Sequence, residues 1–336
     1  MVLTFGEILL RLSPQLGGTW IKEASIPVFI GGAELNAATA LAGWKIPVAY
    51  CSALPENALC REIETHLEEK NIGTGKLIWS GERIGIYMLP QGADLKNASV
   101  IYDRAHSSFS ALRKGDIDWE ALFEGVTYFH LSAISPALNQ EVADLCTEAA
   151  RQAASRGITV TFDLNYRAKL WKYGKQPAEV VPEIVQHCHV VMGNIWAAHT
   201  LLGMDIDPEV AANRAGKDDY LGQAEKTSRQ IMEKFPKVRV VANTFRFDAG
   251  TEGINYYATL LSGKDFVASA EFNTDRVVDK VGSGDCFMAG LLYGLYQNLD
   301  PQATVNFAAS AAFGKLQEYG DATGQTVTDV LKRIEE

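Results

Sequence analysis

An acidic side chain follows two glycines near the end of the chain, where it could accept a proton beside a bound anion. Residues 277–295 read VVDKVGSGDCFMAGLLYGL, which predicts a strand, a Gly-Ser-Gly turn and a long helix. The turn would let the N–H groups of Gly282, Ser283 and Gly284 point together at an anion, with the helix dipole behind them. Asp285 stands in the first helical turn, where it could take the proton of an attacking hydroxyl. The alternative is that Asp285 only caps the helix.

A second glycine turn lies near the N-terminus, in residues 29–44, FIGGAELNAATALAGW. This segment again predicts a strand, a turn and an Ala-rich helix, with Gly32 in the turn and Asn36 one turn into the helix. Close packing of a helix on a sheet would need the same small residues, so the segment alone leaves both roles open. The two glycine turns are far apart in sequence, and only the fold could bring them into one site.

The elements between the two turns are typical of an α/β protein. From about residue 120, β-rich apolar runs alternate with amphipathic helical patterns, which predicts a mostly parallel sheet covered by helices. Short strand-like runs in two other segments predict antiparallel strands outside that sheet. We therefore expect one α/β domain over residues 1–336, with a small β appendage made from residues 11–30 and 81–104. The clearest strands are expected at 128–134, 159–166, 189–194 and 238–245, and the clearest helices at 57–70 and 142–153.

Composition excludes several classes of function. The chain has 336 residues, with 31 Lys and Arg against 41 Asp and Glu, and a net charge of -10. Such a surface attracts neither a nucleic acid nor an anionic membrane. There is no apolar run long enough to span a membrane, and the N-terminal residues do not resemble an export signal. The five cysteines form no CxxC pair, which is typical of free thiols in a reducing compartment, so we expect a cytoplasmic protein.

Taken together, GGAELNAA and DKVGSGDCFMAG resemble the two signature motifs of the ribokinase-like (PfkB) carbohydrate kinase family. Four segments resemble the branch that contains the 2-dehydro-3-deoxygluconate (KDG) kinases: GEILLRLSP at 6–14, RIGIYML at 83–89, VIYDRAHSSFS at 100–110 and FDLNYRAKLW at 162–171. The resemblance covers nearly the whole chain. It implies a ribokinase-like three-layer αβα body with a mostly parallel central sheet, plus a small β-sheet lid that closes over the sugar.

The resemblance also implies a reaction, in which ATP phosphorylates the terminal hydroxyl of a sugar acid such as KDG. Asp285 would be the base, and the amides of Gly282 to Gly284 would form the anion hole. A substrate carboxylate calls for a fixed cation with hydroxyl donors beside it, which Arg104, Tyr102 and Tyr87 could supply. The remaining residues implied by the resemblance are Gly32, Asn36 and Arg167 for the substrate, and Asn165, Thr244, Arg246, Gly253 and Asn306 for ATP, together with Gly282 and Gly284.

For cofactors, the resemblance implies Mg²⁺ with the ATP and allows a monovalent cation. It places residues 243–260 where family members form an ATP loop. One departure concerns the metal, because the family commonly carries an NxxE motif and this chain has Ala197 three residues after Asn194. Asp163 or Asp279 would have to take the place of the missing glutamate, or the activity would be weak. The metal ligands are therefore left unassigned.

Other functions stay open from the sequence. Within the same class, a fructokinase-like or other sugar kinase would share both motifs. A sugar-binding protein without activity would explain the missing glutamate. A dinucleotide-dependent oxidoreductase also opens its βα units with glycine turns, but this chain has no GxGxxG followed by an acidic residue. Because the lid would expose strand edges and apolar surface, we expect a homo-oligomer, a dimer or larger, joined through the lid.

Overall fold

Parallel strands form the centre of the protein, which is described by a computed structural model covering residues 1–91 and 100–335. A 10-stranded sheet has the order β15-β14-β13-β12-β11-β10-β1-β4-β6, with β16 paired to β14. Its strands are β1 (Val2–Phe5), β4 (Val48–Cys51), β6 (Ile72–Gly73), β10 (Tyr128–Ser132), β11 (Thr159–Asp163), β12 (Val190–Gly193), β13 (Val240–Ala249), β14 (Gly253–Ser262), β15 (Asp265–Ala268) and β16 (Phe272–Thr274). All pairs from β6 to β13 are parallel, and β14 pairs antiparallel with its neighbours.

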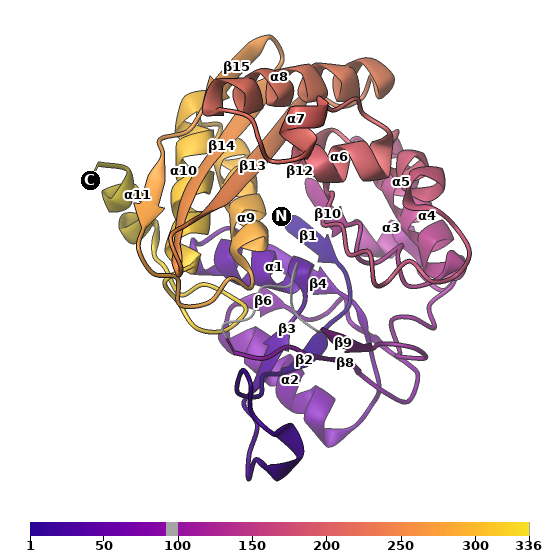
Figure 1. Ribbon diagram of the computed structural model, residues 1–336. Helices are drawn as coiled ribbons and strands as arrows, with labels where there is room; N and C mark the ends of the chain where they lie inside the picture. The colour runs from indigo at the N-terminus through magenta and orange to yellow at the C-terminus, as the bar shows by residue number, and fades with distance from the viewer. Residues whose placement is uncertain (92–99, 336) are drawn as a thin grey trace.

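Helices cover both faces of this sheet (Figure 1). On one face lie α1 (Ala33–Gly43), α2 (Ala58–Glu69), α9 (Ser283–Tyr296), α10 (Pro301–Lys315) and α11 (Val327–Glu335). On the other lie α3 (Trp119–Leu122), α4 (Gln140–Ser155), α5 (Pro177–Val185), α6 (Ile195–Leu202) and α8 (Lys217–Lys234), with α7 (Pro208–Ala211) packed on α8. Successive strand residues point to opposite faces, so Val2 packs with the first group and Leu3 with the second. This is the three-layer αβα body that the resemblance implies.

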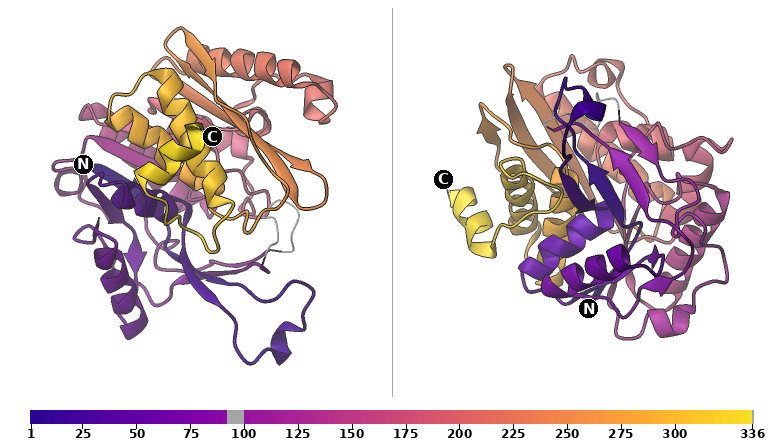
Figure 2. Two further views of the ribbon diagram at one scale, coloured as in Figure 1. Left: turned by 90° about the vertical axis from the view of Figure 1, so that its left-hand side faces the viewer. Right: turned by 90° about the horizontal axis from the view of Figure 1, so that it is seen from below.

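A separate four-stranded sheet stands apart from the body (Figure 2) and is called the small sheet below. It contains β2 (Leu9–Leu12), β3 (Val28–Gly31), β8 (Gly85–Met88) and β9 (Ile101–Asp103), in the order β3-β2-β8-β9. The long loop between β2 and β3 includes the 3₁₀ turn Trp20–Lys22. A further two-stranded sheet pairs β5 (Ala53–Leu54) with β7 (Ile78–Trp79). In the described residues, no helix has the length and apolar character needed to cross a membrane.

The main predicted elements are present, with two differences. Strands β10 to β13 lie at the four predicted positions, and helices α2 and α4 at the two predicted ones. The small sheet is not wholly antiparallel, because β2 and β8 run parallel. Residues 277–281 form no strand: the N–H of Val278 donates to the carbonyl of Leu316 at 2.8 Å, and Asp279 turns back to accept from the N–H of Val281 at 3.0 Å. Residues 92–99 of the second predicted appendage segment lie outside the described residues.

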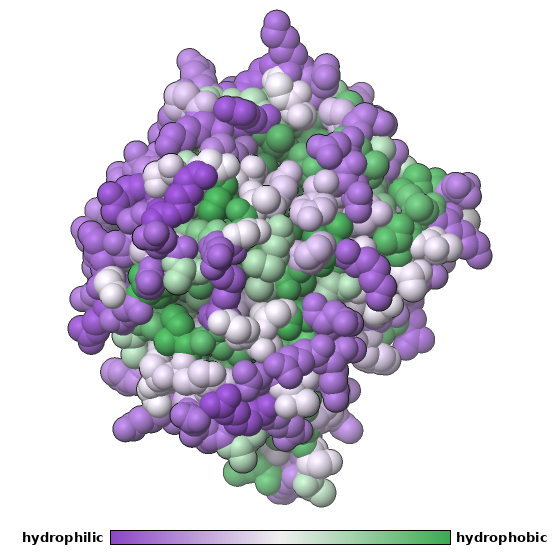
Figure 3. Space-filling model, turned by 180° about the vertical axis from the view of Figure 1, so that it is seen from behind, coloured by the Kyte–Doolittle hydropathy of each residue, from purple (hydrophilic) through white to green (hydrophobic). Residues whose placement is uncertain are grey.

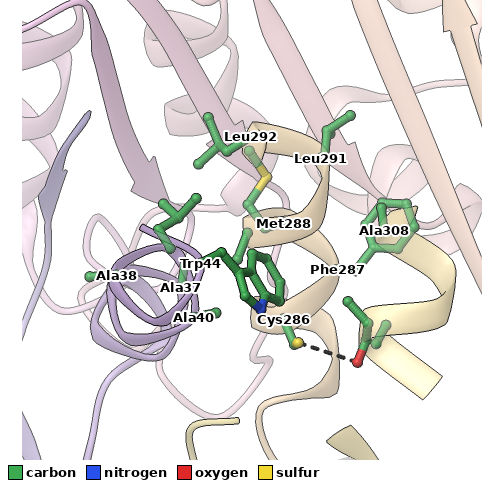
Figure 4. Close-up of a cluster of buried hydrophobic side chains, with 14 of the residues drawn as sticks. Ala37, Ala38, Ala40, Trp44, Cys286, Phe287, Met288, Leu291, Leu292 and Ala308 are labelled. Atoms are coloured by element: carbon green, nitrogen blue, oxygen red, sulfur yellow. Dashed lines mark hydrogen bonds between the residues drawn. The ribbon is translucent and has the colours of Figure 1, made fainter. Parts of the chain in front are cut away.

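Helices α1, α9 and α10 pack closely together behind the two glycine turns. Figure 4 shows Trp44 between the alanines of α1 and the apolar side chains of α9, with Cys286 Sγ donating to the carbonyl of Ala311 at 3.3 Å. Helices α9 and α10 approach so closely that a Cβ on Gly290 would lie 2.6 Å from Cα of Ala308. This packing fixes the beginning of α9, where the candidate anion hole lies.

We expect Gly290→Ala to destabilise the protein, because the added methyl meets the backbone of α10 rather than a movable side chain. Overpacking of this kind costs about 1–3 kcal/mol and should lower the midpoint of thermal unfolding measured by calorimetry. Gly222→Ala is the matched control, since Gly222 lies in α8 with nothing within 4 Å of an added Cβ. There the better helix propensity of alanine should leave the midpoint equal or higher. Equal midpoints for the two variants would contradict this account of the packing.

Candidate active site

The predicted anion hole lies at the first turn of α9. Gly282 precedes the helix in a left-handed conformation with φ of 78°. A side chain there would collide with the backbone carbonyl of Asp321, so this close approach requires glycine. The following N–H groups, including those of Ser283 and Gly284, belong to the first helical turn and have no partner within the helix. They form the positive end of the helix dipole, where an anion is favoured.

Asp285 is held in place by two amide side chains from distant parts of the chain. The amide nitrogen of Asn36 on α1 donates to Oδ2 of Asp285 at 2.7 Å. The amide nitrogen of Asn165, just after β11, donates to Oδ1 at 3.3 Å. The two glycine turns therefore meet in one site, as the resemblance implies. The Oδ1 atom of Asn36 is buried without a hydrogen-bond partner among the described residues, so it can accept from a ligand hydroxyl.

Burial and the neighbouring groups have opposite effects on the pKa of Asp285. Burial raises the pKa of Asp285 to about 6, while the hydrogen bond from Asn36 and the charge of Arg167 act to lower it. The side chain is thus ionised at neutral pH and can accept a proton. A base with a pKa near the working pH is effective at both accepting and releasing a proton.

Two further buried carboxyl groups lie near Asp285. Glu34, in the first turn of α1, accepts a hydrogen bond from the hydroxyl of Ser132 at 2.6 Å, and burial raises its pKa to about 7. Asp163, at the end of β11, has its pKa raised by burial and then by the charge of Asp285. Sequence reasoning does not single out Glu34 as a site residue, although it lies within the GGAELN motif.

Arg104, Tyr102 and Tyr87 come together at the small sheet, but Arg104 already has a partner. Its Nε atom lies 2.6 Å from Oε2 of Glu7, in an ion pair that is almost fully buried. The ion pair uses Nε of Arg104 and does not involve the two terminal nitrogens, Nη1 and Nη2. The hydroxyl of Tyr87 donates to Oδ2 of Asp321 at 2.7 Å, and the ring centroids of Tyr87 and Tyr102 are 6.3 Å apart.

Buried charges beside Gly282 form a second cluster that sequence reasoning missed. Arg11, on β2, lies 3.2 Å from Asp279 and 2.7 Å from Asp321, measured between nitrogen and carboxylate oxygen. The fully buried Lys315 ends α10 next to them and donates to the carbonyl of Glu318 at 3.1 Å. Arg11 was within the quoted GEILLRLSP segment, and only its burial distinguishes it from a surface arginine.

Three of the residues assigned to ATP from the resemblance, Thr244, Arg246 and Gly253, lie on a regular hairpin instead of a loop. Residues 243–260 belong to β13 and β14, which are connected by a short turn, because the alternating apolar residues pair in a continuous register. Thr244 donates from its hydroxyl to the carbonyl of Gly193 at 3.2 Å, and Arg246 pairs across the ladder with Tyr256. Gly253 begins β14, where a Cβ would lie 2.6 Å from the carbonyl oxygen of Ala249. Asn306 is on α10, where its side-chain oxygen accepts from the N–H of Ala270 at 3.0 Å.

The altered NxxE segment has a structural role. Asn194 is the N-cap of α6, and its side-chain oxygen accepts from the N–H of Ala197 at 2.8 Å. Of the two carboxylates considered as replacements, Asp279 is bound to Arg11, whereas Asp163 lies near Asp285. The described residues contain no group of three His, Cys, Asp or Glu side chains that could hold a metal ion.

Comparison with known proteins places this chain in a family. A model described as pfkB family carbohydrate kinase matches residues 1–328. A 2-dehydro-3-deoxygalactonokinase of Haloferax volcanii is 27% identical over 98% of this chain and 95% of its own length. A 2-dehydro-3-deoxygluconokinase of Bacillus subtilis is 25% identical over 98% of this chain and 93% of its own length.

Solved structures show the same relationship. The structure of a 2-dehydro-3-deoxygluconokinase from Thermotoga maritima superposes with a TM-score of 0.89 at 30% identity, covering 100% of this chain and 99% of the other. A PfkB family carbohydrate kinase from Listeria grayi superposes with a TM-score of 0.86 at 28% identity over the same shares of the two chains. The family model, the fold and the meeting of both glycine motifs at Asp285 agree: this chain belongs to the pfkB family of carbohydrate kinases.

Proposed function

We propose that this carbohydrate kinase transfers the γ-phosphoryl group of ATP to the terminal hydroxyl of a 2-dehydro-3-deoxy sugar acid, with KDG as the substrate. The observation that carries the proposal is the position of Asp285. The side-chain amides of Asn36 and Asn165 hold its carboxylate beside the N–H groups of the first turn of α9. The named relatives that act on 2-dehydro-3-deoxy sugar acids support the choice of substrate class. A panel of sugar acids and neutral ketoses, assayed with ATP, tests it.

In the proposed reaction, Asp285 accepts the proton of the substrate hydroxyl as its oxygen forms a bond to the γ-phosphorus. The bond from that phosphorus to the bridging oxygen of ADP breaks, and ADP leaves with the electron pair. The N–H groups of Gly282, Ser283 and Gly284 stabilise the charge on the transferring phosphoryl oxygens. Asn36 and Asn165 orient the carboxylate of Asp285, and Arg167 adds positive charge near it.

The sugar-acid carboxylate is assigned to the terminal nitrogens of Arg104, which the ion pair with Glu7 leaves outside it. That ion pair orients the guanidinium before the substrate arrives, so less side-chain entropy is lost on binding. Tyr87 and Tyr102 line the same end of the site, while Gly32 and Asn36 hold sugar hydroxyls. Because a hydroxyl cannot replace a carboxylate in a charge-assisted pair, Arg104 would favour sugar acids over neutral sugars.

The nucleotide is assigned to the side of α9 that faces β13 and β14. Thr244, Arg246, Gly253 and Asn306 remain its proposed contacts, with Asn165, Gly282 and Gly284 at the phosphates. Mg²⁺ supplies charge neutralisation on the ATP phosphates, and Asp163 is the carboxylate that would hold its waters. A monovalent cation stays possible, and the proposed mechanism has no step that uses it.

We also propose that the small sheet is a lid that closes over the sugar and joins two copies of the chain. Its strand register places four apolar side chains in one row on the face opposite Arg11 and Tyr87: Leu12, Val28, Met88 and Ile101. Val28 is 55% exposed and Ile101 49%. Beyond the strands, Leu16 and Ile21 are still more exposed, and hydrophobic side chains are visible at the projecting end of the molecule (Figure 3).

An apolar row across a small sheet is costly in water and is typical of an interface. A second copy of the same sheet would cover it by a two-fold contact. The proposed location is the cytoplasm, which the five buried free cysteines favour.

The activity should depend on pH through Asp285. Its folded-state pKa of about 6 lies above that of an ordinary aspartate, so the fraction of base falls as pH drops below 6. We expect kcat/KM for the sugar acid to be level above about pH 7 and to fall tenfold per pH unit on the acid side. Steady-state rates between pH 5 and 8.5, with ATP saturating, measure this profile.

Two variants identify the group responsible. Asp285→Asn removes the base and should lower kcat by about 100-fold or more, since general-base assistance contributes 10²–10⁴-fold. Glu34→Gln removes the neighbouring buried acid. In this variant kcat/KM should still fall on the acid side of about pH 6, as in the wild type. Two results would contradict the assignment of Asp285. One is a kcat/KM of Glu34→Gln that no longer falls at low pH, and the other is turnover by Asp285→Asn at the wild-type rate.

The role of Arg104 predicts a difference between substrates. Arg104→Lys keeps a charge for Glu7 but loses the planar fork, and should lower kcat/KM for KDG by about tenfold or more, with a smaller effect on fructose. The ratio of the two rates cancels any damage to the fold. Arg83→Lys is the control, because Arg83 makes an exposed pair with Asp103 close by and should leave the ratio unchanged. An equal loss on both sugars would overturn the carboxylate role.

The lid contact predicts that wild-type protein sediments as a dimer or larger at micromolar concentration. Ile101→Glu places a charge in the apolar row and should give monomers. Leu331→Glu is the matched control, since Leu331 on α11 is 48% exposed but lies outside the small sheet. Wild-type monomers, or an Ile101→Glu variant with unchanged sedimentation, would contradict the proposed interface.

A further inference from the structure

Arg11 is a buried cation for which the proposed reaction has no direct use. Its side chain is 1% exposed, and its guanidinium carbon lies 4.4 Å from the ring centroid of Phe29 on the neighbouring strand. Nη2 donates to Asp279 at 3.2 Å, and Nε lies 2.7 Å from Oδ1 of Asp321. The arginine comes from the small sheet and both carboxylates come from the body. One side chain therefore connects the two parts.

Both of its carboxylates border the candidate anion hole. Asp279 accepts from the N–H of Val281 at 3.0 Å and from the N–H of Gly320 at 3.3 Å, so it connects the two loops that meet there. The backbone carbonyl of Asp321 lies against Gly282, with no space for a side chain between them. The carboxylate of Asp321 also accepts from Tyr87, the cross-strand neighbour of Arg11.

The charges of this cluster oppose one another close to the beginning of α9. Asp279 and Asp321 carry negative charge, and Arg11 and the buried Lys315 carry positive charge. Burial raises the pKa of Asp321, and the charge of Arg11 is the largest influence that lowers it. Without Arg11, the uncompensated carboxylates would oppose the attraction of the helix terminus for an anion, in a region where charges are weakly screened.

Arg11 interacts with its two carboxylates mainly through its positive charge, because it uses few of its hydrogen-bond donors. Its contact with Asp321 is close but not aligned as a hydrogen bond, and its buried Nη1 has no hydrogen-bond partner among the described residues. A residue retained only for shape and hydrogen bonding would be expected to use its donors more completely.

We propose that Arg11 is a positioning residue that neutralises Asp279 and Asp321 beneath Gly282 and so keeps the anion hole attractive to the ATP phosphates. This inference rests on the proposed function, because it takes the first turn of α9 as the phosphate site. It also makes phosphate binding dependent on the small sheet, since Arg11 reaches the anion hole only when β2 is docked.

The test measures the affinity of purified protein for Mg²⁺ with a non-hydrolysable ATP analogue by calorimetry, which needs no sugar. Arg11→Met should weaken binding about tenfold or more at pH 8. The charged groups that face Asp321 are Arg11, Asp279 and Lys315, with the hydroxyl of Tyr87. Arg11→Lys keeps the charge and should stay within about threefold of wild type.

The double variant Arg11→Met with Asp321→Asn restores the charge balance and should recover most of the affinity, which a purely structural role would not allow. Arg61→Met is the matched control, because Arg61 stacks on Trp79 at the surface of α2 and should have no effect. If Arg11→Met does not fold, Asp321→Asn alone should bind at least as tightly as wild type. Weaker binding by Asp321→Asn, unchanged binding by Arg11→Met, or no recovery in the double variant would overturn the inference.

The same binding measurements distinguish a failure of the proposed function from a failure of this inference. Wild-type protein that binds no nucleotide would overturn the proposed site and this inference with it. Wild-type binding together with an unaffected Arg11→Met overturns the inference alone.

Discussion

The site depends on keeping buried negative charge next to the helix terminus that is to receive a phosphate. Asp285 must be ionised to act as a base, yet it lies in the same helical turn as the N–H groups that bind the anion. Burial raises its pKa to about 6, and the amide of Asn36 and the charge of Arg167 limit that rise. This balance depends on the packing of α1, β11 and α9, because α1 and the segment after β11 bring Asn36 and Asn165 to the carboxylate on α9.

The small sheet also contributes to the charge balance at the beginning of α9, because Arg11 pairs with Asp279 and Asp321. Its inward face places Arg11 and Tyr87 against the loops that carry Asp279 and Asp321, and Arg104, just after β9, pairs with Glu7. Its outward row is apolar and exposed at the edge strands. A sheet with charged contacts on one face and apolar side chains on the other is suited to close on a site and to pair with a second copy. Phosphate binding, sugar binding and assembly would then all depend on one sheet.

Much of this arrangement could be predicted from the sequence, since local patterns specify local structure. The strand, glycine turn and helix at residues 29–44 and the regular strands from 128 to 245 follow from periodicity. The meeting of Asn36 with Asp285 could be inferred only from the resemblance, because nothing local connects the ends of the chain. Residues 277–281 were wrongly predicted as a strand: their β-branched side chains favour one, but Asp279 and Leu316 hold the backbone in an irregular path. Arg11 and Glu34 were missed because burial of a charged side chain is a tertiary property.

The most direct test of the central claim is the ionisation of Asp285 in the free protein. Aspartate labelled with ¹³C at the carboxyl carbon, with Asp285→Asn used to assign the resonance, reports the midpoint by NMR titration. The account predicts a midpoint near pH 6. A midpoint near the ordinary aspartate value of about 3.9 would show an exposed, unperturbed carboxylate and would contradict it.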